Sequence, residues 1–110
     1  MNRRPTRYHV YVVLLDPAHH RRPDPDRPWV YLGQTSLTPE KRFDLHTSGA
    51  RRKNEKGRLF NTKVRDHGLQ LLPELVADLP PIYVEEDALA YEAEVAERLR
   101  AQGYAVEGGT

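Results

Sequence analysis

The chain has 110 residues, which suffice for one domain with a single modest core and leave no room for a second. It has no cysteine, which excludes a disulfide framework and a thiolate zinc site and favours the reducing cytoplasm. The 17 basic and 16 acidic residues give a net charge of +1, and the N-terminal segment lacks a long apolar run. We therefore expect a soluble chain with neither signal peptide nor membrane span.

The near-neutral total hides an uneven distribution of charge. The net charge is +3 over residues 1–39, +5 over residues 40–67 and −7 over residues 68–110. Asymmetry of this kind predicts that the middle of the chain meets a polyanion. Small basic stretches are also common on surfaces, so these side chains could instead only solvate a loop.

Two strands are predicted first. Residues 8–15, YHVYVVLL, are β-branched, aromatic and almost continuously apolar, as in a central strand buried on both faces. Residues 16–28 contain four prolines and alternating charges, which indicate a surface loop. Strand chemistry resumes in residues 29–35, WVYLGQT, so the two strands are expected to form an antiparallel hairpin.

Two helices and a third strand are predicted next. Thr38 before Pro39 is a helix-start signal, and we expect a helix from Pro39 to about Thr47. A second helix is expected within residues 59–68, with Leu59, Phe60 and Val64 on one side and a stop at His67 and Gly68. Prolines break residues 69–84 into short pieces, one of which is expected to supply a third strand.

The clearest helix lies within residues 85–104. Acids crowd its first turn, Arg98 and Arg100 lie in its last turn, and Gly103 terminates it. The i, i+3, i+4, i+7 rule predicts one buried face, made of Leu89, Glu92, Val95, Ala96 and Leu99. A carboxylate therefore lies within an apolar stripe.

These elements carry several short motifs. They are the strand HVYVVLL, the strand VYLG that ends at Gly33, the Gln34-Thr35 pair, the Arg-x-x-x-His of RFDLH, and the late helix ALAYEAEVAERLRAQGY. In this order the chain resembles the GIY-YIG nuclease domain over about its whole length. The resemblance implies a single domain over residues 1–110. It also implies an α+β fold, with a small, three-stranded, mainly antiparallel sheet flanked by three helices.

The resemblance also implies an activity, which is divalent-metal-dependent hydrolysis of DNA phosphodiester bonds, in duplex or branched DNA. The matching catalytic positions are Tyr11, Tyr31, Arg42, His46 and Glu92. Such a reaction needs stabilisation of negative charge on the phosphoryl oxygens, an activated water and neutralisation of the departing 3′ oxygen.

Each matching residue suits one part of that task. Arg42 offers a planar fork of donors and lies four residues before His46, so the two face the same way. We expect Tyr31 to act as base with Tyr11 as its orienting neighbour, although phenol needs a lowered pKa for this role. His46 is expected to donate to a phosphate oxygen or to share the proton of the water. The alternatives are a surface arginine, strand aromatics that only pack, and a histidine that caps a helix.

Glu92 is the expected ligand of one Mg²⁺ or Mn²⁺ ion, with water and phosphate oxygen as the other ligands. Glu94 lies about 200° further around the helix, toward solvent. Glu97 stays open as a competitor, and a salt-bridged helix acid is the alternative for Glu92. Tyr8 and Tyr83 are expected to pack, and His19 and His20 to be solvated.

DNA contacts are expected from residues that track flanking phosphates, which gives affinity without sequence information. They are Gln34, Thr35, Arg51, Arg52, Lys53, Lys56, Arg58 and Lys63, with Arg65 beside them.

The sequence departs from the common family pattern twice. The first motif reads His9-Val10-Tyr11 without a glycine, and no asparagine follows the last helix. These departures favour an alternative, a catalytically weak or inactive nucleic-acid-binding module on the same scaffold. A second alternative is an interaction module that uses the acidic helix to bind a protein. The oligomeric state is open, and a monomer is assumed.

Overall fold

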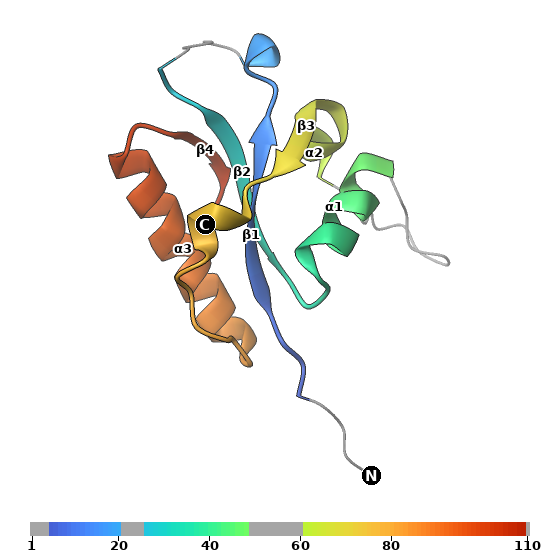
Figure 1. The fold of residues 1–110 in the computed structure, drawn as a ribbon, viewed down its shortest axis with the longest axis vertical. Helices are drawn as coiled ribbons and strands as arrows, with labels where there is room; N and C mark the ends of the chain where they lie inside the picture. The colour runs from blue at the N-terminus through green and yellow to red at the C-terminus, as the bar shows by residue number, and fades with distance from the viewer. Residues whose placement is uncertain (1–4, 21–25, 49–60, 110) are drawn as a thin grey trace.

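The computed structural model describes residues 5–20, 26–48 and 61–109. Within these ranges the chain has four strands, three α-helices and two short 3₁₀ segments, which confirms an α+β fold (Figure 1). The elements are β1 (His9–Leu15), η1 (Pro17–His19), β2 (Trp29–Thr35), α1 (Pro39–Ser48), α2 (Thr62–His67), β3 (Gly68–Leu71), η2 (Pro73–Val76), α3 (Glu85–Ala101) and β4 (Ala105–Gly108).

The sheet has the strand order β3-β1-β2-β4, and β1 is antiparallel to both of its neighbours. The predicted hairpin and the third strand are thus confirmed. The predicted three-stranded, mainly antiparallel sheet was wrong, because β4 pairs in parallel with β2 from Trp29↔Ala105 to Leu32↔Gly108. Gly103, with φ of 95°, turns the chain after α3 and returns it beside β2.

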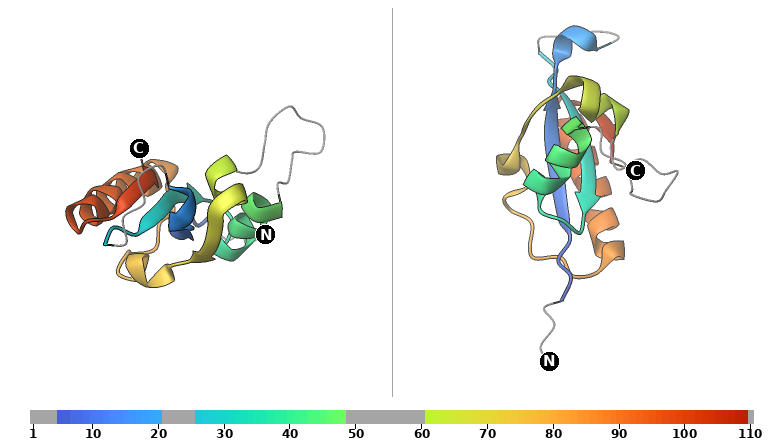
Figure 2. Two further views of the ribbon diagram at one scale, coloured as in Figure 1. Left: turned by 90° about the horizontal axis from the view of Figure 1, so that it is seen from above. Right: turned by 90° about the vertical axis from the view of Figure 1, so that its right-hand side faces the viewer.

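Helices cover both faces of this sheet, with α3 on one side and α1 and α2 on the other (Figure 2). Alternate residues of β1 therefore enter two separate cores. One core joins the sheet to α3, and its buried members include Val10, Val12, Val30, Leu32, Val95, Ala96 and Leu99. The other lies under α1 and α2, and its buried members are Tyr11, Val13, Leu15, Trp29 and Val64.

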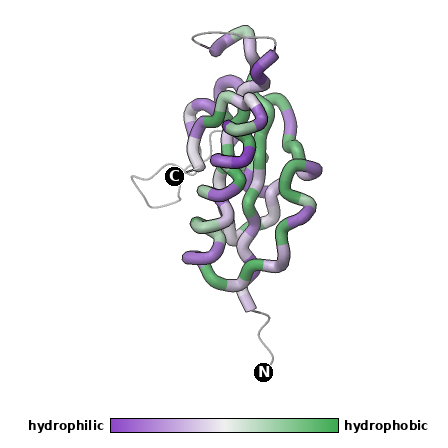
Figure 3. The backbone as a smooth tube through the Cα atoms, turned by 90° about the vertical axis from the view of Figure 1, so that its left-hand side faces the viewer, coloured by the Kyte–Doolittle hydropathy of each residue, from purple (hydrophilic) through white to green (hydrophobic). Residues whose placement is uncertain are grey.

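The buried stripe of α3 begins one residue earlier than predicted. Ala88, Glu92, Val95, Ala96 and Leu99 are buried, whereas Leu89 is 41% exposed. Ala88 is four residues before Glu92, so it takes the place in the stripe that Leu89 was expected to fill. Seen from the side of this helix, hydrophilic and hydrophobic residues are interspersed along it (Figure 3).

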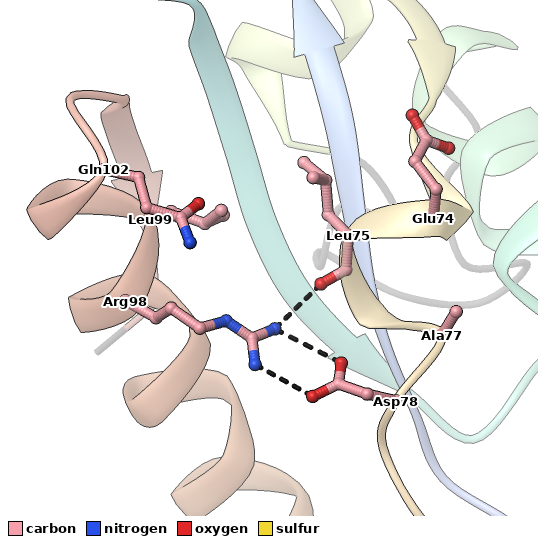
Figure 4. A pocket seen from close by; sticks show the side chains of 7 residues that line it. All are labelled: Glu74, Leu75, Ala77, Asp78, Arg98, Leu99 and Gln102. Carbon is pink, nitrogen blue, oxygen red and sulfur yellow. Dashed lines mark hydrogen bonds and ion pairs between the residues drawn. The ribbon is translucent and has the colours of Figure 1, made fainter.

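A salt bridge and a hydrogen bond join α3 to the segment around η2 (Figure 4). The guanidinium of Arg98 donates to both carboxylate oxygens of Asp78, at 3.0 and 3.4 Å, and to the carbonyl oxygen of Leu75, at 2.9 Å. Asp78 is largely exposed, so this ion pair orients the segment and contributes little free energy.

Of the remaining predictions about packing and exposure, some are confirmed and others are wrong. Tyr8 packs against the α3 core as expected, but Tyr83 is 52% exposed, so its predicted packing was wrong. His19 is exposed as predicted and also stacks on His67 at 4.7 Å, whereas His20 is half-buried with its ring edge against Trp29. None of the helices in the described ranges combines the length and apolar content that crossing a membrane requires.

Substitution of two glycines after α3, Gly103 and Gly108, tests the pairing of β4 with β2. Gly103 and Gly108 both have positive φ, but a Cβ at Gly103 would meet open space and one at Gly108 would meet the backbone oxygen of Leu32. We expect Gly103→Ala to lower the free energy of unfolding by about 1 kcal/mol, from backbone strain alone. Gly108→Ala should lower it by about 3 kcal/mol or more, because β4 must also move.

Urea denaturation of the two variants beside the wild type measures this difference. Equal losses of stability in Gly103→Ala and Gly108→Ala would contradict the pairing of β4 with β2.

Candidate active site

Two phenols meet over a glycine on the sheet face that α1 and α2 cover. Tyr11 on β1 is the cross-strand partner of Gly33 on β2, and the ring centroids of Tyr11 and Tyr31 are 6.2 Å apart. A Cβ at Gly33 would lie 2.8 Å from Tyr11 Oη and 3.1 Å from Tyr31 Cε1. The glycine of the YLG motif is therefore needed because both rings lean across it.

His46 on α1 holds the hydroxyl of Tyr11. It is fully buried, and its Nε2 lies 2.8 Å from Tyr11 Oη. The backbone N–H of Asn61 donates to its Nδ1 at 2.6 Å. Burial, helped by the charge of Arg42, lowers the pKa of His46 to about 4, so the ring is neutral near pH 7.

These contacts fix the tautomer of His46. Because Nδ1 accepts from a backbone N–H, the single ring proton lies on Nε2 and is donated to Tyr11 Oη. Both ring nitrogens are thus occupied and the side chain has no exposed surface. This geometry makes His46 a positioning residue for Tyr11 and revises the predicted donation to a phosphate or water.

Arg42 lies one helical turn before His46, where the Thr38 cap fixes the start of α1. The hydroxyl of Thr38 accepts from Lys41 N–H at 3.2 Å, and its carbonyl oxygen accepts from Arg42 N–H at 3.0 Å. The positive charge of Arg42 lowers the pKa values of Tyr11, Tyr31 and His46 together. Its charge therefore acts on all three side chains, as expected if Arg42 and His46 lie on the same side of α1.

The two phenols differ in their electrostatic surroundings. Burial is the largest effect on both and raises the pKa of Tyr11 far above its ordinary value and that of Tyr31 less far. Hydrogen bonding between them raises the pKa of Tyr11 and lowers that of Tyr31. This is the pattern in which Tyr11 donates and Tyr31 accepts, so Tyr31 is the better placed of the two to carry a negative charge.

Glu92 approaches the same phenol from the other layer of the fold. It lies on α3, is 7% exposed, and its negative charge raises the pKa of Tyr31. Burial raises the pKa of Glu92 itself, while a hydrogen bond from the backbone of Gly109 lowers it. Gly109 follows Gly108, the last residue of β4 that pairs with β2, so Glu92 is held beside the end of that pairing.

The competing acids on α3 point elsewhere. Glu94 is exposed, as predicted, and Glu97, which the sequence leaves open, is exposed as well. Glu92 is therefore the one buried acid of the three.

The acid can contribute one ligand to a metal ion. Within the described ranges, no three His, Cys, Asp or Glu side chains lie together in a way that could hold a metal by themselves. Mg²⁺ is commonly held by one or two carboxylates with water and substrate phosphate as the other ligands. A single buried carboxylate whose charge acts on Tyr31 fits an ion of that kind and does not form a closed cage of protein ligands.

The residues expected to contact DNA have different surroundings. Thr35 is buried, and its hydroxyl accepts from Leu37 N–H at 3.0 Å, which ties down the turn after β2. Lys63 lies over the Trp29 ring at 5.6 Å and 3.9 Å from the carboxylate of Glu107. Gln34 is half-buried, and Arg65 pairs with Asp66 at 2.8 Å. The others lie outside the described residues: Arg51, Arg52, Lys53, Lys56 and Arg58.

Sequence reasoning missed three residues that shape the site. Asn61 fixes His46 through its backbone and caps α2 through its side chain, which accepts from Lys63 and Val64 N–H. An asparagine ahead of a helical pattern is a signal for such a cap. Glu107 lies in β4 and Gly109 directly follows it. The four residues of β4 carry no strand signal strong enough to be found in the sequence.

Comparison of the chain with protein-family models gave no match, and comparisons with curated proteins and with solved structures gave none either.

The buried neutral ring of His46 predicts a loss of stability in acid. Its pKa is about 4 in the folded chain against an ordinary value of 6.5, so the unfolded chain binds the proton first as the pH falls. We expect this residue to cost the fold about 3 kcal/mol between pH 7 and pH 4.

Two measurements check this. In an NMR titration His46 should titrate near pH 4. The free energy of unfolding should fall less steeply with pH in His46→Gln than in the wild type. A His46 midpoint near 6.5 would contradict the buried contact with Tyr11.

Proposed function

We propose that the protein is a divalent-metal-dependent endonuclease of the GIY-YIG type that hydrolyses DNA phosphodiester bonds. The observation that supports this best is that two opposite charges act on Tyr31. Arg42 comes from α1 on one face of the sheet and Glu92 from α3 on the other, and both change the pKa of the same phenol. A cationic fork, a phenol and a carboxylate together provide a place for a phosphate, a water and a cation.

Arg42 binds the phosphate in this mechanism. Its planar guanidinium can donate to two phosphoryl oxygens at once and so stabilise the charge that accumulates on them as water attacks. The fold prepares this residue because the Thr38 cap fixes the first turn of α1.

Tyr31 takes the proton of the attacking water. A phenolate at Tyr31 accepts the hydrogen bond that Tyr11 donates, and Tyr11 in turn accepts from His46 Nε2–H. The chain of donors starts at the backbone N–H of Asn61 and ends at Tyr31, so each hydroxyl proton points toward the base. Burial alone would make Tyr31 a poor base at pH 7, and Arg42 and Tyr11 act against that effect.

Glu92 would hold the Mg²⁺ or Mn²⁺ ion. When bound, the ion would supply positive charge for the departing 3′ oxygen and for the nucleophile. The role of the protein is to hold this carboxylate in place near Tyr31, through the hydrogen bond from the backbone of Gly109.

The basic middle of the chain would bind flanking phosphates of duplex or branched DNA. Residues 40–67 carry nine Lys or Arg against four acids, an excess that favours a polyanionic partner. A chain without cysteine suits the cytoplasm, which we propose as its location.

A catalytically inactive nucleic-acid binder on the same scaffold is the second candidate. The first motif reads His9-Val10-Tyr11, and the chain GYAVEGGT after the last helix has no asparagine. In this chain the backbone of Gly109 donates to the acid, which favours a functional Glu92 over a lost one.

Cleavage of DNA by purified variants tests the proposal. We expect Arg42→Ala and Glu92→Gln each to lower the rate of plasmid nicking at least about 100-fold in Mg²⁺ or Mn²⁺, because each removes charge stabilisation of the transition state. Exposed residues serve as matched controls, and Arg7→Ala and Glu94→Gln should nick at the wild-type rate.

Circular dichroism and thermal melting establish that each variant is folded. Full activity in Arg42→Ala or Glu92→Gln would refute the mechanism. Salt-dependent DNA binding by the wild type without nicking in any divalent metal would select the inactive binder instead.

A further inference from the structure

Gln34 has a buried oxygen without a partner. Its Oε1 has almost no exposed surface, and no donor in the described ranges lies within hydrogen-bonding distance. Leaving a buried acceptor unsatisfied costs about 1 to 3 kcal/mol, so such an atom needs an explanation. Gln34 follows Gly33 on β2.

The side chain of Gln34 faces α3. Side chains alternate along a strand, and Val30 and Leu32 at the same parity pack in the core that β2 shares with α3. The cross-strand partner of Gln34 is Val10, which belongs to the same core. Gln34 therefore lies on the face of the sheet from which Glu92 approaches.

The position of α3 along β2 puts Gln34 and Glu92 at similar heights on the sheet. A Cβ on Gly109 would meet Ala96 Cβ at 2.5 Å and Leu32 Cδ2 at 3.1 Å, so Ala96 and Leu32 are near neighbours. The helix runs antiparallel to β2, from the end of the sheet where Thr35 lies to the end where Ala105 pairs with Trp29 (Figure 1).

The distances from Ala96 to Glu92 along the helix and from Leu32 to Gln34 along the strand are similar. Glu92 is four residues before Ala96, about 6 Å along the helix axis. Gln34 is two residues after Leu32, about 7 Å along the strand in the same direction. The acid and the amide are consequently at about the same height along β2, on the same face of the sheet.

We propose that Gln34 Oε1 is a second protein ligand, beside the Glu92 carboxylate, of the divalent cation. This rests on the proposed function because it takes Glu92 as the first ligand. An amide oxygen is a hard, neutral donor of the kind Mg²⁺ and Mn²⁺ accept, and a cation satisfies a buried acceptor that no protein donor reaches. One carboxylate and one amide leave the remaining positions to water and phosphate.

Mn²⁺ binding by the DNA-free protein tests the proposal, because the electron paramagnetic resonance signal of free Mn²⁺ reports binding without activity. We expect Gln34→Ala to weaken binding about tenfold. Gln34→Glu keeps the size of the side chain and adds a charge, so it should strengthen binding about tenfold. Gln70→Ala, on the exposed side of β3, is the matched control and should bind as the wild type.

A second measurement locates the ion. In an NMR spectrum of the wild type, sub-stoichiometric Mn²⁺ should broaden the side-chain amide of Gln34 before that of Gln70. Melting curves of the variants establish that they are folded, and if Gln34→Ala is unfolded, Gln34→Glu decides the question.

The possible results separate this inference from the proposed function. Wild-type affinity in both Gln34→Ala and Gln34→Glu, or no Mn²⁺ binding by the wild type, overturns the inference. If Mn²⁺ binding changes as expected but the wild type leaves plasmid DNA intact, the metal site stands and the nuclease function falls. If the wild type nicks DNA while both variants bind Mn²⁺ normally, the function stands and Gln34 is no ligand.

Discussion

The hydroxyl of Tyr11 is the contact on which the site depends. It crosses from β1 over Gly33 on β2 and meets His46 on α1, at 2.8 Å. Two strands and a helix are thereby tied at one atom, and the N–H of Asn61 ties the start of α2 to the same imidazole. Because the imidazole is buried and neutral, the polarity of the whole chain of hydrogen bonds is set by a backbone group.

The arrangement of helices on both faces of the sheet explains how charges of opposite sign act on one phenol. Arg42 and Glu92 belong to helices on different faces of the sheet, and the charges of both act on Tyr31 of β2. The pairing of β2 with β4 ends at Leu32 and Gly108, and the next residue, Gly109, donates its backbone N–H to Glu92.

Much of this arrangement could be predicted from the sequence. β2 and α1 follow from local signals, namely strand residues that end in Gly-Gln-Thr and a Thr-Pro helix start. The expectation that Arg42 and His46 lie on the same side of α1 follows from helical spacing. β4 could not be found, because four residues with a glycine carry little strand propensity and its parallel pairing depends on where α3 ends. The orientation of His46 was also hidden, because it depends on a backbone N–H supplied 15 residues later.

The central claim is that one phosphate lies between Arg42, Tyr31 and a cation on Glu92. A crystal structure with a DNA fragment and Ca²⁺, which binds oxygen ligands without supporting cleavage, measures this directly. The account predicts a backbone phosphate within hydrogen-bonding distance of the Arg42 guanidinium and Ca²⁺ on the Glu92 carboxylate, with a water next to Tyr31 Oη. DNA bound on another face of the molecule, with Arg42 and Glu92 away from any phosphate, would contradict it.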